Sequence, residues 1–325
     1  MKGMQYRKAG ESGLKLPVIS LGLWHNFGDS APLERSRDIL LNAFENGVTH
    51  FDLANNYGPA YGSAETNFGK IMASDLRPHR DEMVISTKAG YDMWPGPYGD
   101  GGSRKYLMAS LDQSLKRMGL EYVDIFYSHR YDAETPIEET MQALVDIVRS
   151  GKALYAGISN YPREKSIQAY KYLEERDVHC ILHQGRYNML VRNAESDGIL
   201  DCTAEAGTGY IAFSPLAQGL LTDRYFNGIP EDSRAAVNKF LKKDAITDSL
   251  VDTLKRLDVI ATKRGQTLSQ MALAWILKDR RVTSVIIGAS SVAQLLTNLK
   301  AEACLEFTEE ELLEIDGILR DGGCL

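Results

Sequence analysis

The sequence has no long hydrophobic run and no excess of positive charge over its 325 residues. A membrane-spanning helix needs roughly 20 consecutive apolar residues, and no stretch approaches that length. Residues 1–6 also lack the apolar core of a signal peptide. The net charge of −7 leaves no basic face to neutralise phosphates. We therefore expect a cytoplasmic protein whose partners include neither a nucleic acid nor a membrane.

Cysteine is scarce and irregularly placed. No Cys-x-x-Cys pair occurs, so the sequence indicates neither a disulfide framework nor a metal site. We expect the four cysteines to be reduced and structural; they are Cys180, Cys202, Cys304 and Cys324. The hydrophobic content of 44% is enough for a large core. Since no linker or shift in composition divides the chain, we expect one domain over residues 1–325.

Short apolar segments alternate with amphipathic segments along most of the chain. Strands are expected at residues 18–23, 49–53, 83–87, 122–127, 153–158, 180–184, 209–213 and 284–287. Helices are expected at residues 32–46, 63–73, 104–117, 136–149, 163–175, 196–206, within 245–278 and at 291–299. Eight such pairs predict an α/β fold, a closed (β/α)8 TIM barrel. The alternative is a doubly wound open sheet, whose dinucleotide-binding form needs a Gly-x-Gly-x-x-Gly turn that residues 21–26 lack.

Four segments lie outside this repeat. Residues 4–17 are expected to form an N-terminal β-hairpin around the turn 10–13. A final helix is expected at residues 307–320, where Thr308 and Glu311 form a capping box. The long loops 91–102 and 216–243 follow the third and seventh strands. Because loops after barrel strands surround the active-site mouth, we expect these two loops to lie where chemistry occurs.

Ionisable side chains stand at the C-terminal ends of three successive strands. Asp52 ends the second strand, and Tyr57 lies on the loop beyond it. Lys88 ends the third strand and His129 ends the fourth. Each residue alone is commonly structural, pairing with a loop or capping a helix. Their shared position favours a common site at the mouth of the barrel.

These four side chains suit the reduction of a carbonyl group. A carboxylate such as Asp52 keeps a buried lysine charged, and that cation is expected to lower the pKa of a nearby tyrosine. Tyr57 would then protonate the carbonyl oxygen, while His129 donates a hydrogen bond to it. A different chemistry for the same position is a Schiff base formed by Lys88, as in barrel aldolases.

Five motifs follow one another along nearly the whole chain: Phe51-Asp52-x-Ala54-x-x-Tyr57-Gly58, Lys88, His129, Gly157-Ile158-Ser159-Asn160 and Gln184-x-x-Tyr187-Asn188. In this order and spacing they resemble the aldo-keto reductases. The resemblance implies a catalytic tetrad of Asp52, Tyr57, Lys88 and His129, with the tyrosine as general acid. It agrees with the assignment made from the residues alone.

The resemblance also implies NADP(H) as cofactor and a set of residues that bind it. Ser159, Asn160 and Gln184 would hold the nicotinamide carboxamide, and Phe213 would stack on the ring unless it only packs the core. Arg224 and Arg234 resemble cations near the pyrophosphate and the 2′-phosphate. A glycine turn that leads into a helix suits an anion. The other residues assigned to the cofactor are Trp24, Asp52, Ser214, Pro215, Leu216, Gln218, Gly219, Ser233, Gly288, Ser290, Gln294 and Asn298.

Within the family, segments 20–28, 89–99 and 128–130 resemble the branch that includes potassium-channel β subunits and bacterial L-glyceraldehyde 3-phosphate reductases. This implies reduction of L-glyceraldehyde 3-phosphate to glycerol 3-phosphate and of small aldehydes such as methylglyoxal. The residues assigned to the substrate are Trp24, Tyr57, Trp94, His129 and Arg130. Trp24 and Trp94 alternatively pack the barrel rim, and Arg104 and Lys105 are further candidates to hold the phosphate.

Two properties follow from the branch alone. Its members assemble as tetramers or larger rings, so a homo-oligomer, a tetramer or octamer, is expected. Channel β subunits carry asparagine where His129 stands, which favours an enzyme over a non-catalytic subunit that binds NADP(H) and senses redox state.

Overall fold

The computed structural model describes residues 3–231, 233–237 and 241–323. Eight parallel strands close into a barrel in the order β10-β3-β4-β5-β6-β7-β8-β9, which confirms the predicted (β/α)8 fold. The strands are β3 (Ile19–Gly22), β4 (His50–Asp52), β5 (Val84–Ala89), β6 (Val123–Ser128), β7 (Ala153–Ser159), β8 (Cys180–Arg186), β9 (Gly209–Phe213) and β10 (Val282–Ile287).

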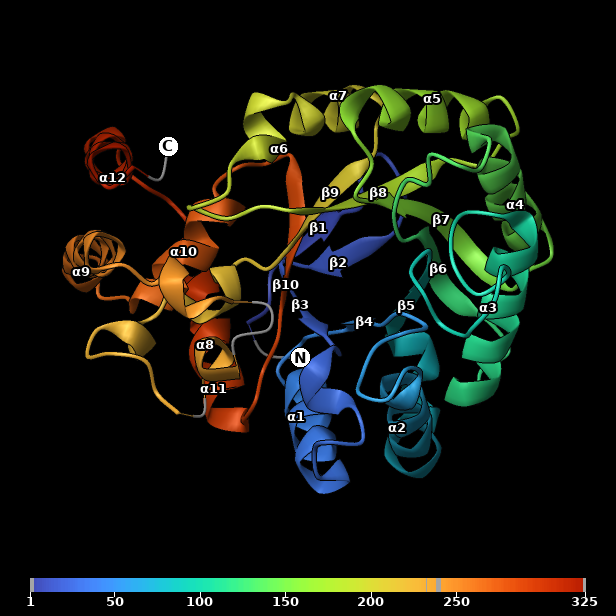
Figure 1. The fold of residues 1–325 in the computed structure, drawn as a ribbon, viewed down its shortest axis with the longest axis horizontal. Helices are drawn as coiled ribbons and strands as arrows, with labels where there is room; N and C mark the ends of the chain where they lie inside the picture. The colour runs from blue at the N-terminus through green and yellow to red at the C-terminus, as the bar shows by residue number, and fades with distance from the viewer. Residues whose placement is uncertain (1–2, 232, 238–240, 324–325) are drawn as a thin grey trace.

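A ring of helices surrounds the strands, and α9 and α12 lie outside this ring (Figure 1). The helices are α1 (Leu33–Glu45), α2 (Ser63–Ile71), α3 (Arg104–Met118), α4 (Ile137–Arg149), α5 (Arg163–Glu174), α6 (Asn193–Ser196), α7 (Ile199–Glu205), α8 (Arg234–Val237), α9 (Asp248–Lys263), α10 (Leu268–Leu277), α11 (Val292–Leu299) and α12 (Glu309–Asp321). Shorter helical turns are η1 (His25–Phe27), η2 (Met72–Leu76), η3 (Arg77–Glu82), η4 (Ala217–Gly219), η5 (Asp223–Tyr225), η6 (Lys243–Ala245) and η7 (Lys300–Ala303).

Three predicted helices differ from those observed. The helical region 245–278 is two helices, because Gly265 adopts φ 67° after α9 and a capping box at Thr267 starts α10. The helix expected at 196–206 begins at Ile199, after the separate turn of α6. The helix expected at 63–73 ends its regular part at Ile71 and continues as η2 and η3. The final helix has the expected capping box at Thr308.

The predicted hairpin closes one end of the barrel. Its strands pair antiparallel and are β1 (Tyr6–Lys8) and β2 (Lys15–Pro17). Figure 1 shows them in the middle of the helix ring. The backbone N–H of Glu11 donates to the Gly207 carbonyl at 2.7 Å. Ala9 and Leu16 are fully buried against inward-facing barrel residues that include Val84, Ile125, Leu182 and Ile211. The hairpin therefore plugs this end and leaves the other end for chemistry.

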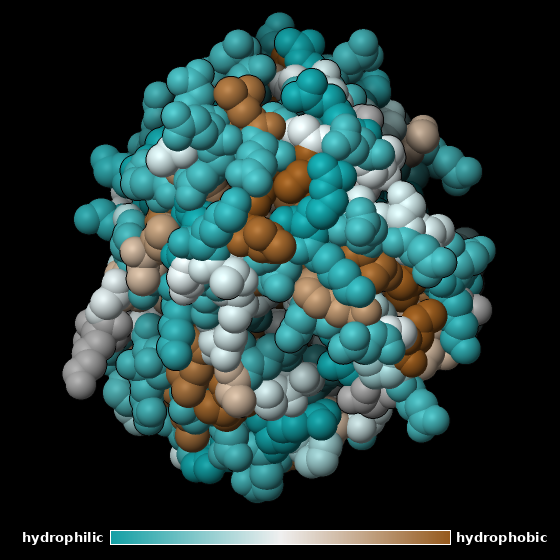
Figure 2. All heavy atoms as spheres, turned by 90° about the vertical axis from the view of Figure 1, so that its left-hand side faces the viewer, coloured by the Kyte–Doolittle hydropathy of each residue, from teal (hydrophilic) through white to brown (hydrophobic). Residues whose placement is uncertain are grey.

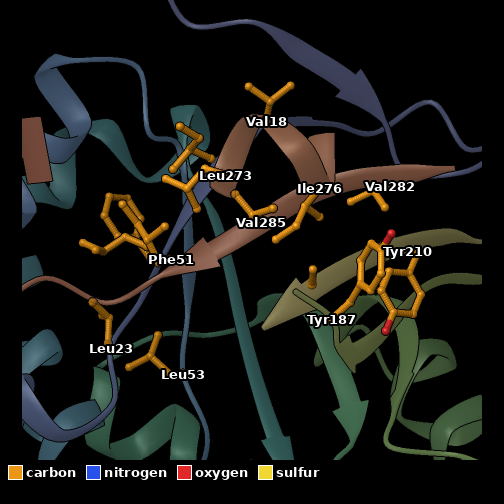
Figure 3. Packing of buried hydrophobic residues seen from close by; sticks show 14 of the residues in the cluster. Val18, Leu23, Phe51, Leu53, Tyr187, Tyr210, Leu273, Ile276, Val282 and Val285 are labelled. Carbon is orange, nitrogen blue, oxygen red and sulfur yellow. The ribbon is translucent and has the colours of Figure 1, made fainter. Parts of the chain in front are cut away.

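The main core lies between the barrel strands and the helices. In Figure 3, Val285 of β10 lies beside Leu273 and Ile276 of α10, and Tyr187 lies beside Tyr210. The two tyrosine rings meet edge to face, with centroids 6.4 Å apart. All ten residues of α10 are buried, because this helix packs against β10 on one side and α9 on another. An apolar surface all round is what such a position requires.

Figure 2 shows the face on which α9 and α12 are outermost; most of it is hydrophilic, with small scattered hydrophobic spots. Val259 of α9 and Leu313 of α12 are exposed. Within the described ranges, no helix has the length and apolar character needed to cross a bilayer. The same part of the chain holds no cluster of three metal-ligating side chains.

Glu65 joins α2 to α3 and β5 from a fully buried position. Its carboxylate accepts from Arg117 Nε at 2.7 Å and from Thr87 Oγ1 at 2.5 Å. We expect Arg117→Met to lower the free energy of unfolding by about 3 kcal/mol, because it leaves a buried carboxylate without its cation. The control is Arg256→Met, which breaks an exposed pair with Asp321 and should cost less than about 1 kcal/mol. Equal urea midpoints for the two variants would contradict this view of Glu65.

Burial of His183 is expected to make the free energy of unfolding depend on pH. Burial lowers the pKa of His183 to about 3, whereas an unfolded histidine titrates near 6.5. Between these values the unfolded chain binds more protons, so stability falls as the pH drops from 6.5. We expect His183→Asn to reduce that slope by up to about 1.4 kcal/mol per pH unit. Urea unfolding at pH 7.0, 6.0, 5.0 and 4.5 measures it; identical slopes for both proteins would show that His183 is not the group that titrates.

Candidate active site

A buried ion pair lies at the open end of the barrel. Lys88 Nζ is 2.6 Å from Asp52 Oδ2, and both side chains are almost fully buried. Lys88 also donates to the Leu53 carbonyl at 2.5 Å. Burial lowers the pKa of Lys88, and the carboxylate of Asp52 opposes that shift. The ion pair is thus the contact that keeps a cation inside the barrel.

Asp52 Oδ1 accepts two further hydrogen bonds, from Ser86 Oγ at 2.8 Å and Gln184 Nε2 at 3.0 Å. Strand pairing explains this convergence, since Asp52 is in register with Ser86 on the neighbouring strand β5. Gln184 reaches the same oxygen from β8, across the barrel. Three donors therefore compensate the buried carboxylate.

Tyr57 stands next to this pair. Its Oη accepts from Lys88 Nζ at 3.3 Å, and Nζ lies 4.7 Å from the ring centroid. The expected lowering of its pKa was wrong. Desolvation of the hydroxyl raises the pKa of Tyr57 well above its usual value, and Asp52 and Tyr91 act in the same direction. The phenol therefore keeps its proton at neutral pH. It does not donate that proton to Lys88, because Lys88 is the donor in their hydrogen bond.

The ring of His129 lies next to that of Tyr57. The ring centroids are 5.9 Å apart, and Tyr91 meets the imidazole edge to face at 4.7 Å. Burial lowers the pKa of His129 well below its usual value, and Lys88 and Arg130 lower it further. Within the described chain, its Nδ1 has no hydrogen-bond partner. The imidazole is a neutral side chain that carries one N–H donor.

The loops after β3 and β4 touch, and this contact sets the position of Trp24 and Tyr57. A Cβ on Gly28 would lie 2.7 Å from the Cα of Gly58, so only glycine allows this approach. The Trp24 ring lies 6.4 Å from that of Tyr57. The guanidinium of Arg234 lies 5.7 Å from the Trp24 ring, so the long loop after β9 reaches the same mouth.

The predicted carboxamide ligands lie at the ends of β7 and β8. Ser159 is fully buried, and Asn160 Nδ2 donates to its Oγ at 3.0 Å and to the His129 carbonyl at 3.1 Å. Asn160 has the left-handed φ of 55°. The side-chain amide of Gln184 donates a hydrogen bond to Asp52, so Gln184 also belongs to the hydrogen-bond network of the ion pair. These residues border the tetrad.

The segment after β9 has an unusual backbone. Ser214, Ala217 and Gln218 have φ values of 52°, 47° and 62°. Each left-handed non-glycine residue costs roughly 1 kcal/mol, and such strain concentrates at functional sites. The half-buried Phe213 is the last residue of β9, and the other predicted residues of this segment, Pro215, Leu216 and Gly219, follow it in the turn. The exposed Arg224 lies in η5, and the buried Ser233 accepts from the Ala236 N–H at 3.2 Å.

The segment between β10 and α11 completes the predicted cofactor site. Gly288 is exposed, and Ser290 donates from N and Oγ to Gln294 Oε1 at 2.8 and 3.0 Å. Ser291 caps α11. Asn298 is buried, and its Nδ2 has no hydrogen-bond partner in the described part of the chain. A buried donor without a partner suits an acceptor atom of a nucleotide, so these residues fit such a cofactor.

The predicted substrate residues are only partly brought together. Arg130 follows His129; it donates to the Gly90 carbonyl at 2.7 Å and to Asp100 at 3.0 Å. Trp94 packs on Tyr106 of α3 with centroids 5.1 Å apart, and its role as a pocket wall stays a prediction. The two other cations lie on α3, where Arg104 pairs with Asp146 of α4 and Lys105 lies over the ring of Tyr98.

Sequence reasoning missed residues that complete the site. Tyr91 packs on His129, and Ser86 and His50 form hydrogen bonds that lead to Asp52. Alternation along the strands could have identified two of them, because residues two apart face the same way. His50 precedes Asp52 by two positions, and Ser86 precedes Lys88 by two.

This geometry supports proton donation better than nucleophilic attack by Lys88. The ammonium group has three N–H donors, and Asp52, Leu53 and Tyr57 accept all three. Its side chain is fully buried. Two proton-bearing groups, Tyr57 and His129, lie side by side instead.

Comparisons with known proteins agree with this assignment. The Aldo/keto reductase family matches residues 18–320. L-glyceraldehyde 3-phosphate reductase of Escherichia coli (strain K12) is 57% identical over 323 residues, which cover 98% of this chain and 93% of that protein. A probable voltage-gated potassium channel subunit beta of Arabidopsis thaliana is 39% identical over 306 residues, covering 92% of this chain and 91% of that protein. The chain therefore belongs to the aldo/keto reductase family and is an oxidoreductase.

Proposed function

We propose that this oxidoreductase is an NADPH-dependent aldehyde reductase that converts L-glyceraldehyde 3-phosphate to glycerol 3-phosphate and also accepts small aldehydes such as methylglyoxal. The observation that carries the proposal is the position of Lys88 Nζ, 2.6 Å from Asp52 Oδ2 and 3.3 Å from Tyr57 Oη. Lys88 donates to the phenol oxygen, so the phenol proton is available to a carbonyl oxygen.

The chain supplies the proton and stabilises the charge. When bound, a nicotinamide cofactor supplies the hydride. As negative charge develops on the carbonyl oxygen, Tyr57 and the neutral His129 donate to it. The proton of Tyr57 moves to that oxygen, because an alkoxide is a stronger base than a phenolate. Lys88 then lies next to the phenolate and stabilises it until solvent returns the proton.

NADP(H) is the proposed form of the cofactor. Arg234, beside Trp24, supplies a cation at the mouth, and the buried amide of Asn298 offers a donor without a partner in the described chain. Guanidinium groups bind phosphates with charge-assisted hydrogen bonds. A 2′-phosphate held by Arg234 would favour NADPH over NADH.

Arg130 is the proposed anchor for the substrate phosphate. It follows His129 directly, and its guanidinium lies 5.4 Å from the ring of Tyr91, which itself packs on His129. Its partner Asp100 is more than half exposed, so a substrate phosphate can compete for the guanidinium. The relatives named L-glyceraldehyde 3-phosphate reductase support a phosphorylated aldehyde as substrate.

The first test is NADPH oxidation with an aldehyde substrate. We expect Tyr57→Phe to lower kcat by about 10²- to 10⁴-fold, the usual contribution of a positioned acid. Tyr61→Phe is the matched control, because Tyr61 is exposed and donates to Asp92, outside the tetrad. A Tyr57→Phe protein as fast as wild type would remove the proposed acid. Cofactor binding without turnover on a broad aldehyde panel would favour a redox-sensing subunit.

The phosphate anchor has a separate test. We expect Arg130→Met to lower kcat/KM for L-glyceraldehyde 3-phosphate by about 10- to 100-fold, because hydrogen bonds to charged groups contribute roughly 1.5–3 kcal/mol. The value for methylglyoxal should change little, since it carries no phosphate. Arg256→Met, which breaks the exposed pair with Asp321, serves as control. Equal losses on the two aldehydes would assign Arg130 to the structure of the loop instead.

A further inference from the structure

A line of buried polar side chains runs along four adjacent barrel strands and ends at Asp52. Ser284, Ser20, His50 and Ser86 are all fully buried, and they come from four adjacent strands, β10, β3, β4 and β5. The oxygens of Ser284 and Ser20 are 2.7 Å apart. His50 Nδ1 lies 2.9 Å from Ser20 Oγ, and its Nε2 lies 3.0 Å from Ser86 Oγ. The line ends where Ser86 donates to Asp52 at 2.8 Å.

The chemistry of these groups fixes the direction of every bond in the line. The carboxylate of Asp52 only accepts, so the single proton of Ser86 points at it. Ser86 Oγ must therefore accept from Nε2 of His50. Burial lowers the pKa of His50 to about 4, so the ring is neutral at pH 7 and its Nδ1 accepts. Ser20 then donates to Nδ1, and Ser284 donates to Ser20.

We propose that His50, as the neutral Nε2–H tautomer, is a positioning residue for the reduction: it holds the Ser86 hydroxyl toward Asp52, so that the carboxylate stays charged and Lys88 stays an ammonium beside Tyr57. This inference rests on the proposed function. His50 touches neither the tyrosine nor a reacting atom in this arrangement and acts through Ser86 and Asp52.

The need for such a residue follows from burial. A serine hydroxyl rotates freely, so without a donor at its oxygen the proton of Ser86 is not held toward Asp52. The N–H of His50 occupies that oxygen and leaves Asp52 as the target of the proton. Hydrogen bonds in a line also strengthen one another in a medium of low dielectric constant. A purely apolar filling of this space would leave Asp52 with two donors, from Lys88 and Gln184.

Other titratable groups also face the ion pair. Tyr57 and His129 adjoin it from the loops after β4 and β6, and Tyr127 of β6 lies with its ring centroid 5.9 Å from Lys88 Nζ. Glu65 of α2 raises the pKa of Lys88 through its charge, a smaller effect than that of Asp52. None of these groups bonds to His50, so a change at His50 reaches the pair through Ser86.

The tautomer is tested by ¹⁵N NMR of histidine-labelled wild-type protein. The signals of His50 are assigned by their loss in His50→Gln. We expect a protonated Nε2 and an unprotonated Nδ1 from pH 6 to pH 8. A protonated Nδ1 would reverse the line and overturn the proposal. This readout needs no turnover, so it decides the tautomer even if the proposed function fails.

The positioning role is tested by the pH profile of kcat/KM. His50→Gln retains an amide donor near the place of Nε2, whereas His50→Asn reaches only the place of Nδ1 and His50→Leu reaches neither. We expect the acidic limb of the last two to move to higher pH by about 0.5 to 1 unit, since a carboxylate that loses a hydrogen-bond donor holds its negative charge less well. His50→Gln should stay close to wild type.

His183→Leu is the matched control. His183 is buried to a similar degree and bonds to Tyr170 Oη at 2.8 Å, away from Asp52. The pH profile of kcat/KM of His183→Leu should keep the wild-type shape, even if the substitution lowers the free energy of unfolding. Unchanged profiles for all three His50 variants, or an equal shift in His183→Leu, would overturn the positioning role. Failure of the wild type to oxidise NADPH would instead reject the proposed function.

Discussion

The ion pair between Asp52 and Lys88 is the interaction on which the site depends. Burying two charges away from solvent costs free energy unless hydrogen bonds compensate each charge. In this site both charges are compensated. Lys88 places its three N–H groups on Asp52, Leu53 and Tyr57. Asp52 receives three donors, from Lys88, Ser86 and Gln184. The surrounding barrel can be understood as the framework that brings these donors to one point.

That framework was largely predictable from the sequence. The alternation of strands and helices predicts the closed barrel, and a parallel barrel places all strand ends at one mouth. Asp52, Lys88 and His129 could therefore be grouped without coordinates. The helix boundaries around residues 198 and 265 were less predictable, because an amphipathic pattern continues across a local break in the backbone.

The electrostatics of the site could not be read from the sequence. A lysine next to a tyrosine suggested an acidified phenol, yet burial and the charge of Asp52 raise the pKa of Tyr57. Spacing along the chain reports which groups meet, but it does not report how much water each one loses. The result changes the account of the chemistry: Tyr57 is a protonated donor at rest, and its proton transfers as charge builds on the substrate oxygen.

Polar residues inside the barrel carried a signal that motif reasoning did not use. His50 and Ser86 each stand two positions before a tetrad residue, and alternation turns them to the same interior. Their roles depend on hydrogen-bond partners on other strands, which a single sequence does not give. The backbone strain at Ser214, Ala217 and Gln218 is similarly invisible in the residue types, since none of them is glycine.

Asp52 is expected to act on the reaction through Lys88. The most direct measurement is a double-mutant cycle on NADPH-dependent reduction of methylglyoxal, with Asp52→Asn, Lys88→Met and the double variant. We expect each single change to remove most of kcat/KM and the double variant to lose no more than the worse single one. Losses that multiply, or a Lys88→Met protein with the wild-type rate, would contradict this expectation.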